Sequence, residues 1–330
     1  MKKSILKPVD AVIAITYQCN SQCIMCGIWK KKEMPAMQAE DFLALPKSLV
    51  DLNISGGEPF LRADLPDFVS KAKECCSDVN IIISTNGFAT ALIVTQMEKI
   101  LKIDPEIGVA VSIDGLEEVH NQVRRIENGF NKSMATIAEL KKMGVKKIKI
   151  GFTIADYNYQ ELRKVYELSR ELGVELSLSL VHSSENFFSQ ENKVDKKNEI
   201  IEQLEWLIGE ELKTWNPKKW ARAYYTYGMI QYIKTGKRIL PDYSGQSSIF
   251  IDPNCDVYPS DISSNKIGTI KNKFIISAPA TVTEGWMICT ARPAIKKHWA
   301  RAIFWILRNK FYSFVIPAKA GIQAPQMMDV

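Results

Sequence analysis

Three cysteines within eight residues are the part of this chain whose types and spacing point most directly to chemistry. Cys19, Cys23 and Cys26 follow the spacing CxxxCxxC, directly after the apolar run 11–15. Cysteine thiolates are the standard ligands of iron–sulfur clusters, so three of them on one loop can hold three corners of a [4Fe–4S] cube. A fourth cysteine is missing nearby. One iron would therefore keep an open coordination position, as a catalytic zinc with three protein ligands does.

Ordinary buried thiols, a zinc site and disulfides are the competing interpretations of these cysteines. Chance clustering is disfavoured because the 330 residues contain only seven cysteines. A zinc site needs a fourth ligand, and the histidines, His120, His182 and His298, are far away in sequence. An odd cysteine count in a long chain without a secretory signal does not suit a disulfide framework. Cluster ligation is the favoured interpretation.

A second motif, Ser55-Gly-Gly-Glu-Pro59, follows after a predicted strand. Together with the CxxxCxxC spacing, it makes residues 8–185 resemble the radical S-adenosylmethionine (radical SAM) superfamily. Beyond these residues the resemblance continues, more weakly, into a C-terminal extension of the SPASM/twitch type. The resemblance implies a [4Fe–4S] cluster on the three cysteines, with S-adenosylmethionine (SAM) bound at the open iron. It also implies reductive cleavage of SAM to a 5′-deoxyadenosyl radical that takes hydrogen from a substrate.

Short apolar runs alternate with amphipathic helical stretches along the first 190 residues. Strands are predicted at 11–16, 50–54, 80–84, 108–113, 147–153 and 174–180. Six strand–helix units predict an α/β fold with a parallel sheet, curved or closed. The resemblance narrows this to a parallel partial (β/α)6 TIM-like barrel with a small C-terminal hairpin and helix extension. In parallel barrels the chemistry lies on loops at the carboxyl ends of the strands, and both motifs follow predicted strands.

The Gly-Gly-Glu-Pro segment is the first candidate SAM-binding element. Gly56 and Gly57 have no Cβ, so the backbone can approach a ligand closely there. Glu58 supplies a carboxylate suited to the SAM ammonium group. The resemblance implies that these residues and Pro59 contact the methionine part of SAM. A plain strand-to-helix turn is the alternative.

Further candidates follow the later strands. The resemblance implies ribose contacts from Ser112 and Asp114, for which turn chemistry is the alternative. It places Arg124, at the end of His120-Asn-Gln-Val-Arg124, near the SAM carboxylate, with Arg125 or a solvated helix face as alternatives. The remaining candidate SAM contacts are Ser84, Asn86, Thr153, Asn158 and Val181.

The C-terminal extension lacks most of the cysteines that SPASM/twitch relatives use for a second cluster. The segment 249–259 predicts a hairpin around Pro253-Asn254. Ser260 stands at the first expected cysteine position, and only Cys255 and Cys289 remain. Two thiols cannot supply a four-thiolate cluster, so the sequence predicts one cluster per chain.

Four parts are expected along the chain. Residues 1–190 form the radical SAM core, 191–245 a helical connection, and 246–312 the degenerate extension. Residues 313–330 resemble the translation of a genomic repeat and are expected to be a disordered tail. The basic and aromatic helix at 296–311 either packs its aromatic residues on the barrel or makes a peripheral contact with an anionic membrane.

Composition and charge limit the class of protein. With 46% apolar residues, the chain can bury one large core plus an appendage. A net charge of +6, spread along the sequence, gives no case for nucleic-acid binding. Apolar stretches stay shorter than the ~18 residues of a membrane span, so we expect a cytoplasmic protein.

The sequence thus predicts a cytoplasmic radical SAM enzyme that acts on a small-molecule, lipid-linked or peptide substrate. It would receive electrons from an external one-electron donor such as flavodoxin or ferredoxin. One alternative is a peptide-modifying SPASM-type maturase. Others are a non-catalytic iron–sulfur-binding protein from a degraded gene and a zinc-binding structural protein.

Overall fold

The computed structural model describes residues 7–185, 187–271, 273–276 and 285–315. Its strands are β1 (Asp10–Ala14), β2 (Asp51–Ser55), β3 (Asn80–Thr85), β4 (Gly108–Ser112), β5 (Lys147–Ile154), β6 (Glu175–Leu180), β7 (Ser248–Ile251), β8 (Asp256–Tyr258), β9 (Gly268–Thr269) and β10 (Ile275–Ile276). The six predicted strands are β1 to β6, each within two residues of its predicted bounds. Short runs rich in isoleucine and valine form strands because branched side chains suit a pleated surface.

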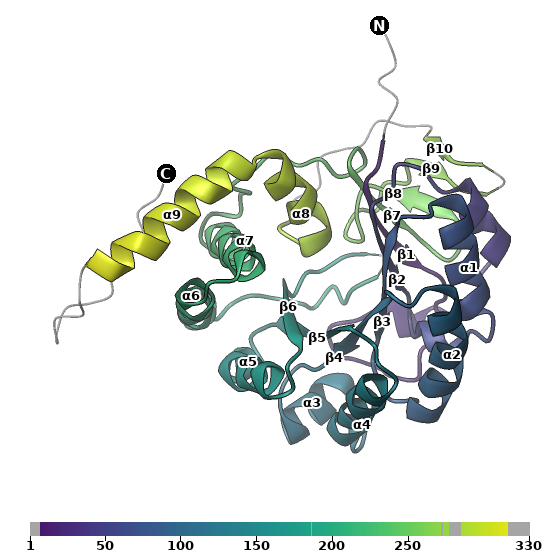
Figure 1. Ribbon diagram of the computed structural model, residues 1–330, viewed down its shortest axis with the longest axis horizontal. Coiled ribbons are helices and arrows are strands. Elements are labelled where there is room, and N and C mark those ends of the chain that lie inside the picture. The colour runs from purple at the N-terminus through teal and green to yellow at the C-terminus, as the bar shows by residue number, and fades with distance from the viewer. Residues whose placement is uncertain (1–6, 186, 272, 277–284, 316–330) are drawn as a thin grey trace, which may run out of the picture.

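Within the described residues, all strands form one sheet in the order β10-β9-β8-β7-β1-β2-β3-β4-β5-β6. Neighbours from β1 to β6 pair in parallel, and β7 pairs in parallel with the other side of β1. The strands β8, β9 and β10 add antiparallel pairs. Figure 1 shows a curved sheet with helices along its convex side. The predicted α/β partial barrel is confirmed, and the extension continues its sheet.

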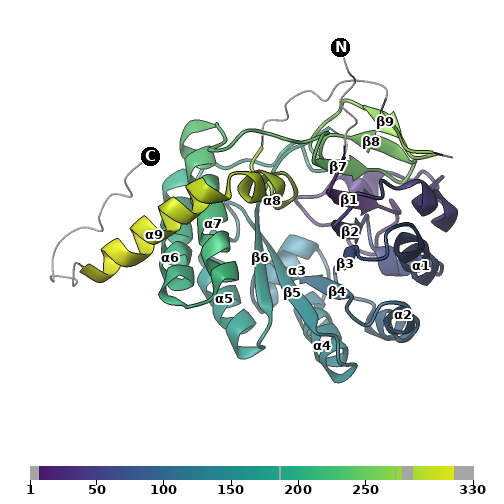
Figure 2. The ribbon, with the colours of Figure 1, turned by 45° about the horizontal axis from the view of Figure 1, so that its top comes forward.

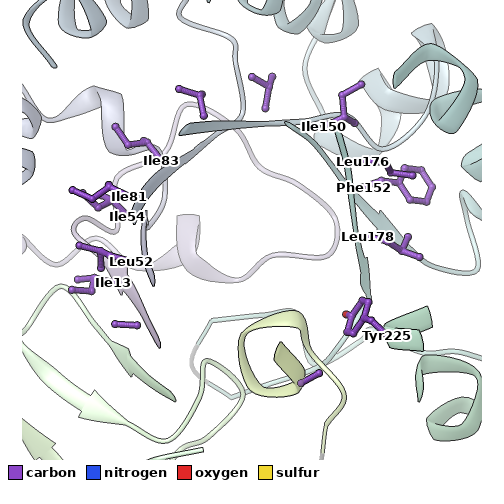
Figure 3. Close-up of a cluster of buried hydrophobic side chains, with 14 of the residues drawn as sticks. Ile13, Leu52, Ile54, Ile81, Ile83, Ile150, Phe152, Leu176, Leu178 and Tyr225 are labelled. Carbon is purple, nitrogen blue, oxygen red and sulfur yellow. The ribbon is translucent and has the colours of Figure 1, made fainter. Parts of the chain in front are cut away.

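Side chains along the parallel strands alternate between an apolar outer face and a polar inner face. Ile13, Ile54 and Ile83 are fully buried and point away from the barrel interior (Figure 3). The inner positions carry small polar side chains, and a cavity of about 220 Å³ is lined by Asn53, Ser84, Ser112, Thr153, Ser177 and Ser179, among others. The period of two along a strand therefore separates the hydrophobic core from a hydrophilic interior.

The helices are α1 (Leu65–Cys75), α2 (Thr90–Ile103), α3 (Glu117–Arg124), α4 (Gly129–Lys142), α5 (Leu162–Glu171), α6 (Lys197–Lys213), α7 (Pro217–Thr235), α8 (Ile288–Lys297) and α9 (Trp299–Val315). Short 3₁₀ turns are η1 (Ile28–Lys30), η2 (Ala39–Ala44), η3 (Pro59–Leu61) and η4 (Tyr159–Glu161). Gly144 and Gly173 follow α4 and α5 with φ of 79° and 64°. This left-handed conformation ends both helices, and it favours glycine.

The C-terminal extension contacts the barrel through β7 and α8, among other segments. The strand β7 runs beside β1, with Ile251 paired to Ile13. Ile288 and Cys289 of α8 line the same interior cavity as the strands. At the start of β1, Arg292 Nε donates a hydrogen bond of 2.7 Å to Asp10. In Figure 2, α8 lies between β1 and β7 on one side and α7 on the other, so the extension covers the open side of the barrel.

The extension differs from its prediction in its connectivity. The hairpin around Pro253-Asn254 is confirmed, because β7 and β8 pair in antiparallel fashion across it. The expected helix at 296–311 is instead divided between α8 and α9 at His298, whose Nε2 is 2.8 Å from the Tyr243 hydroxyl. The expected tail 313–330 lies outside the described residues, apart from the end of α9. In the part of the chain that the structure describes, no helix has the length and hydrophobicity needed to cross a membrane.

Candidate active site

The predicted site residues meet at one edge of the sheet. The cysteine loop follows β1, the Gly-Gly-Glu-Pro segment follows β2, and Asn86 and Asp114 follow β3 and β4. Asn158 and Val181 follow β5 and β6. Because these strands are parallel, their carboxyl ends lie at the same edge, and a set of loops spread over 160 residues becomes one surface.

The three cysteines lie on a loop whose sulfur atoms already have polar neighbours. Asn86 Nδ2 is 3.9 Å from Cys19 Sγ, and Arg124 Nη1 is 3.6 Å from Cys23 Sγ. The Ser21 hydroxyl is 3.2 Å from Cys23 Sγ, and the Cys26 thiol faces a backbone carbonyl at 3.6 Å. Side chains from outside this loop thus place N–H donors beside two of the sulfurs.

The donor set fits an iron–sulfur cluster in its chemistry. Burial raises the pKa of Cys19 to about 12 and that of Cys26 to about 11, so both thiols are protonated at neutral pH. A bound metal removes a thiol proton outright, whatever the free pKa. Among the described residues, no three Cys, His, Asp or Glu side chains are gathered closely enough to hold a metal ion as they lie.

Gly56 and Gly57 are needed for loop packing. A Cβ on Gly57 would lie 2.1 Å from the carbonyl oxygen of Gln18, in the cysteine loop. A Cβ on Gly56, which has φ of 143°, would lie 2.6 Å from the carbonyl oxygen of Thr16. The Gly57 and Glu58 amides donate to these two carbonyls, each at 2.8 Å. The close approach predicted for a ligand is here made by the cysteine loop itself.

The Glu58 carboxyl group is bonded to neighbouring loops in this structure, and its predicted contact with SAM stays a prediction. Its side chain is fully buried, and it accepts hydrogen bonds from the Asn86 amide at 2.7 Å and the Phe60 amide at 3.2 Å. The Thr85 hydroxyl donates a third bond of 2.8 Å. Burial raises the Glu58 pKa to about 7. In this structure the carboxyl group ties the loop after β2 to the loop after β3, and Pro59 is buried beside it as the first residue of η3.

Arg124 and Asp114 form a buried ion pair at the centre of the site. Arg124 Nε and Nη2 are 2.6 and 2.5 Å from the same Asp114 oxygen, and the other oxygen accepts the Thr153 amide at 2.8 Å. Asp114 is fully buried, and its charge holds the Arg124 pKa above the usual value. Arg124, which also reaches Cys23, lies in the site, whereas its neighbour Arg125 is exposed.

Asn158 and His120 form hydrogen bonds with the backbone of Asp114. Asn158 Nδ2 donates to the carbonyl oxygens of Asp114 and Thr153 at 3.0 and 2.9 Å, and its Oδ1 accepts the Ala155 amide. His120 Nδ1 accepts the Asp114 amide at 3.1 Å. Burial lowers the His120 pKa to about 3, so the ring is neutral. Both side chains hold the loop after β4 in place.

The other predicted residues divide between the cavity and an apolar wall. Ser84, Ser112 and Thr153 line the interior cavity. Val181 is 5% exposed and packs in a small cluster with Cys23 and Met25. The sequence analysis did not single out several polar residues at the same edge or cavity, namely Asn20, Ser21, Asn53 and Ser177. Alternation along the strands could have found the last two, since both occupy inner positions.

Cys255 and Cys289 have different surroundings. Cys255 is fully buried in the turn of the hairpin, where its thiol is 3.5 Å from Asp41 Oδ2. Cys289 lies on α8 at the interior cavity, and burial raises its pKa well above the usual value. The two remaining thiols of the extension thus lie in separate environments.

Known proteins resemble this chain mainly over the residues that form the barrel. The family model described as "Radical SAM superfamily" matches residues 13–169. "Fe-coproporphyrin III synthase" of Methanosarcina barkeri is 31% identical over 175 residues, which are 50% of this chain and 41% of that protein. "Sporulation killing factor maturation protein SkfB" of Bacillus subtilis is 26% identical over 191 residues, 54% of this chain and 45% of that protein. The chain spans about half the length of the curated relatives it matches.

Solved structures extend the likeness beyond the barrel. "Native anSMEcpe with bound AdoMet and Cp18Cys peptide" has a TM-score of 0.60 at 14% identity, covering 92% of this chain and 99% of that one. "Native anSMEcpe with bound AdoMet" has a TM-score of 0.58 at 14% identity, covering 91% and 100%. At such identity the likeness shows the fold alone, and that fold includes the C-terminal extension. Residues 13–169 thus match the radical SAM superfamily, and this similarity implies a [4Fe–4S] cluster and SAM as cofactors.

Proposed function

We propose that this protein is a radical SAM enzyme whose cluster is held by Cys19, Cys23 and Cys26. When bound, the cluster supplies the electron that cleaves SAM to a 5′-deoxyadenosyl radical, which abstracts hydrogen from the substrate. The observation that carries the proposal is the meeting of this cysteine loop with Asn86 and the Arg124–Asp114 pair at one sheet edge.

The chain's own groups compensate the charge of the sulfurs. Three thiolates in a half-buried loop are costly unless nearby groups stabilise them. Arg124 brings a positive charge to Cys23, and the Asn86 amide group lies beside Cys19. Because Asp114 fixes the guanidinium group through two of its nitrogens, Arg124 keeps this position before any ligand arrives.

SAM is proposed to lie between the cysteine loop and the interior cavity. The candidate contacts remain Gly56, Gly57, Glu58, Pro59, Ser84, Asn86, Ser112, Asp114, Arg124, Thr153, Asn158 and Val181. Among these, Ser112 and Thr153 offer hydroxyl groups at the cavity, and Val181 offers an apolar surface to the adenine ring. Glu58 and Asn158 also hold the loops on which the other candidates lie.

A peptide is the second candidate substrate, beside a small polar molecule. The fold likeness to anSMEcpe, which is described with a bound peptide, covers nearly the whole chain. A maturation protein, SkfB, is among the relatives. We therefore keep the peptide-modifying maturase as the alternative activity. A flavodoxin or ferredoxin is the proposed electron donor, and a reducing cytoplasm is the proposed location because it keeps the three thiols available.

The proposal assigns the chemistry to residues 1–190 and the shaping of the substrate pocket to 191–245 and 246–312. It also assigns one cluster to each chain, because Cys255 and Cys289 lie in separate environments. Anaerobically reconstituted protein should contain about four irons per chain. A content near eight would contradict the assignment of a single cluster.

The decisive experiment is anaerobic reconstitution followed by dithionite and SAM, with 5′-deoxyadenosine quantified beside a Cys23→Ala control. Nucleoside formation only with intact cysteines supports the proposal. A sound cluster without SAM cleavage favours the non-catalytic iron–sulfur protein. Zinc in place of iron would indicate a zinc-binding structural protein and would contradict cluster binding by Cys19, Cys23 and Cys26.

A further inference from the structure

One face of α9 exposes five large apolar side chains. Trp299, Ile303, Phe304, Leu307 and Phe311 have exposed fractions of 62%, 45%, 58%, 48% and 46%. At 100° per residue they share an arc of about 140° on the helix surface. A continuous apolar arc of this size on a surface helix marks an interaction site, whereas single exposed apolar residues need no explanation.

The opposite face of α9 accounts for its attachment to the protein. Trp305 is 3% exposed and stacks on Tyr227 of α7 at a ring distance of 4.7 Å. Ile306 is buried beside it. By helical spacing Lys310 falls at the edge of the arc, but it is 1% exposed and its Nζ donates to the carbonyl oxygen of Thr214 at 2.8 Å. Packing against α6 and α7 therefore buries one side of α9, and the apolar arc faces away from the protein. In Figures 1 and 2, α9 lies at the periphery, on the outer side of α6 and α7.

Charge around the arc has one sign. The segment 288–315 contains no aspartate or glutamate. Arg301 is exposed, and by helical spacing it borders the arc together with Arg308. Before α9 begins, Lys296 forms an ion pair with Asp51 at 2.9 Å, and Lys297 lies over the Tyr243 ring at 3.9 Å. An amphipathic helix with tryptophan and phenylalanine on one face and cations beside it is suited to an anionic lipid surface.

We propose that α9 lies in the surface of a bilayer that contains anionic lipids. Its apolar arc enters the boundary between headgroups and acyl chains, and Arg301 meets the phosphate groups. A second copy of the chain fits less well, because two α9 helices facing each other would bring cations together without a carboxylate on either helix. The cysteine loop and the cavity are not part of this surface, so the contact is independent of the proposed chemistry.

Vesicle flotation of the full chain tests the proposal. We expect the protein to float with vesicles of equal parts phosphatidylglycerol and phosphatidylcholine. Pure phosphatidylcholine vesicles should retain at least about tenfold less, and high salt should reduce binding to the anionic vesicles because it screens the cations. Apoprotein and cluster-loaded protein should float equally. Failure to float with the anionic vesicles overturns the proposal and leaves the radical SAM assignment untouched.

A matched pair of double variants separates the α9 surface from general hydrophobicity. Ile303→Glu with Leu307→Glu places two carboxylates in the arc and should lower flotation at least about tenfold. Leu43→Glu with Val50→Glu changes two residues of similar exposure, 43% and 51%, on other elements, and should float like the native protein. Thermal melting of each variant checks that it is folded. Equal flotation of both variants contradicts the proposal.

Light scattering distinguishes a second copy from a lipid surface. The proposal predicts that the native protein without vesicles has the mass of one chain, and that the α9 variant has the same mass. A native dimer that the α9 variant dissociates, together with no flotation, would assign the apolar arc to self-association and overturn the lipid proposal.

Discussion

The edge of the barrel that carries the cysteine loop and the C-terminal extension differ in how their polar groups are bonded. At the barrel edge, Glu58, Asp114 and Asn158 are buried, and each makes at least three hydrogen bonds to neighbouring loops. In the extension and the helix beside it, Asp261 Oδ1 and the Tyr225 hydroxyl are buried without a partner among the described residues. At the barrel edge, the unpartnered buried atoms are instead ring nitrogens, Nε2 of His120 and of His182. Figure 3 shows the Tyr225 hydroxyl pointing toward the barrel interior.

This difference in hydrogen bonding suggests different roles for the two regions. A preorganised hydrogen-bond network needs no rearrangement when a cofactor binds. It therefore suits the cofactors that the whole family shares. Unpaired buried polar groups are unfavourable by themselves and are found where a ligand can satisfy them. The barrel edge therefore suits the cluster and SAM, and we propose that the extension contributes to substrate recognition.

The largest expected effect is a loss of iron on replacing a cysteine of the barrel loop, compared with replacing a cysteine of the extension. Cys26→Ser should lower the iron content of reconstituted protein from about four per chain to fewer than about one, because a hydroxyl is a poor cluster ligand. Cys289→Ser is the matched control in the extension, and it should keep its iron. Iron analysis and the absorbance of the cluster measure both. Loss of iron in the control would show that the extension takes part in the cluster site.

Removing one member of the buried ion pair tests the preorganisation of the barrel edge. Arg124→Met should lower the free energy of unfolding of the apoprotein by about 3–5 kcal/mol, because Asp114 is left buried and unpaired. Arg125→Met changes an exposed neighbour of the same type and should stay within about 0.5 kcal/mol. Urea unfolding measures both. Similar effects for the two variants would mean that the pair does not fix the edge.

The contact between β1 and α8 should make stability depend on pH. Burial raises the Asp10 pKa to about 6 although Arg292 opposes the shift. Between about pH 4 and pH 6, the folded chain binds more protons at Asp10 than the unfolded chain, so the stability contributed by Asp10 falls as pH rises. Relative to Asp10→Asn, the native protein should lose about 1–3 kcal/mol of unfolding free energy across this window.

Asp64→Asn provides a control of opposite sign. Arg62 donates hydrogen bonds to Asp64 and lowers its pKa, so its contribution to stability is present above the unfolded pKa and is lost as pH falls. The difference between native protein and this variant should rise with pH, in a window below about pH 4. Urea unfolding over a pH series measures both variants. A flat difference for Asp10→Asn would show that its burial has no energetic consequence.

The smallest expected effect concerns two buried tyrosines. The Tyr17 hydroxyl donates to Asp252 at 3.1 Å, so Tyr17→Phe should cost about 1–2 kcal/mol. Tyr225→Phe removes a hydroxyl without a described partner and should be neutral, or stabilising by up to about 1 kcal/mol. Thermal or urea unfolding compares them. A cost for Tyr225→Phe equal to that for Tyr17→Phe would remove the contrast between the two regions.

Much of the fold could be predicted from sequence because its signals are local. Branched apolar runs mark β1 to β6, and glycines such as Gly144 and Gly173 mark helix ends. The pairing of β7 with β1 could not be predicted in this way, because Asp10 pairs with Ser248, 238 positions later in the chain. The hydrophobic pattern of a strand does not determine which other strand it pairs with. The predicted hairpin therefore appeared as an appendage, whereas the structure makes it part of the barrel sheet.

The same limit applies to the candidate site. Residue types located the loops, but the role of Glu58 depends on the amides of Asn86 and Phe60, and these lie beside its carboxylate only in the folded chain. The choice of Arg124 over Arg125 depends on which of them faces Asp114. Side-chain direction at the end of a short helix follows from packing, and sequence spacing alone leaves both arginines possible.

The sequence by itself determined the chemistry of this protein, namely three thiols in one loop and the order of strands and helices that places them at a barrel edge. Tertiary structure decided which polar groups bond to one another, because those bonds join residues far apart in the chain. It also decided which face of α9 is outward. That helix is apolar on both sides, so only the packing of Trp305 against α7 shows that Trp299 and Phe304 are exposed.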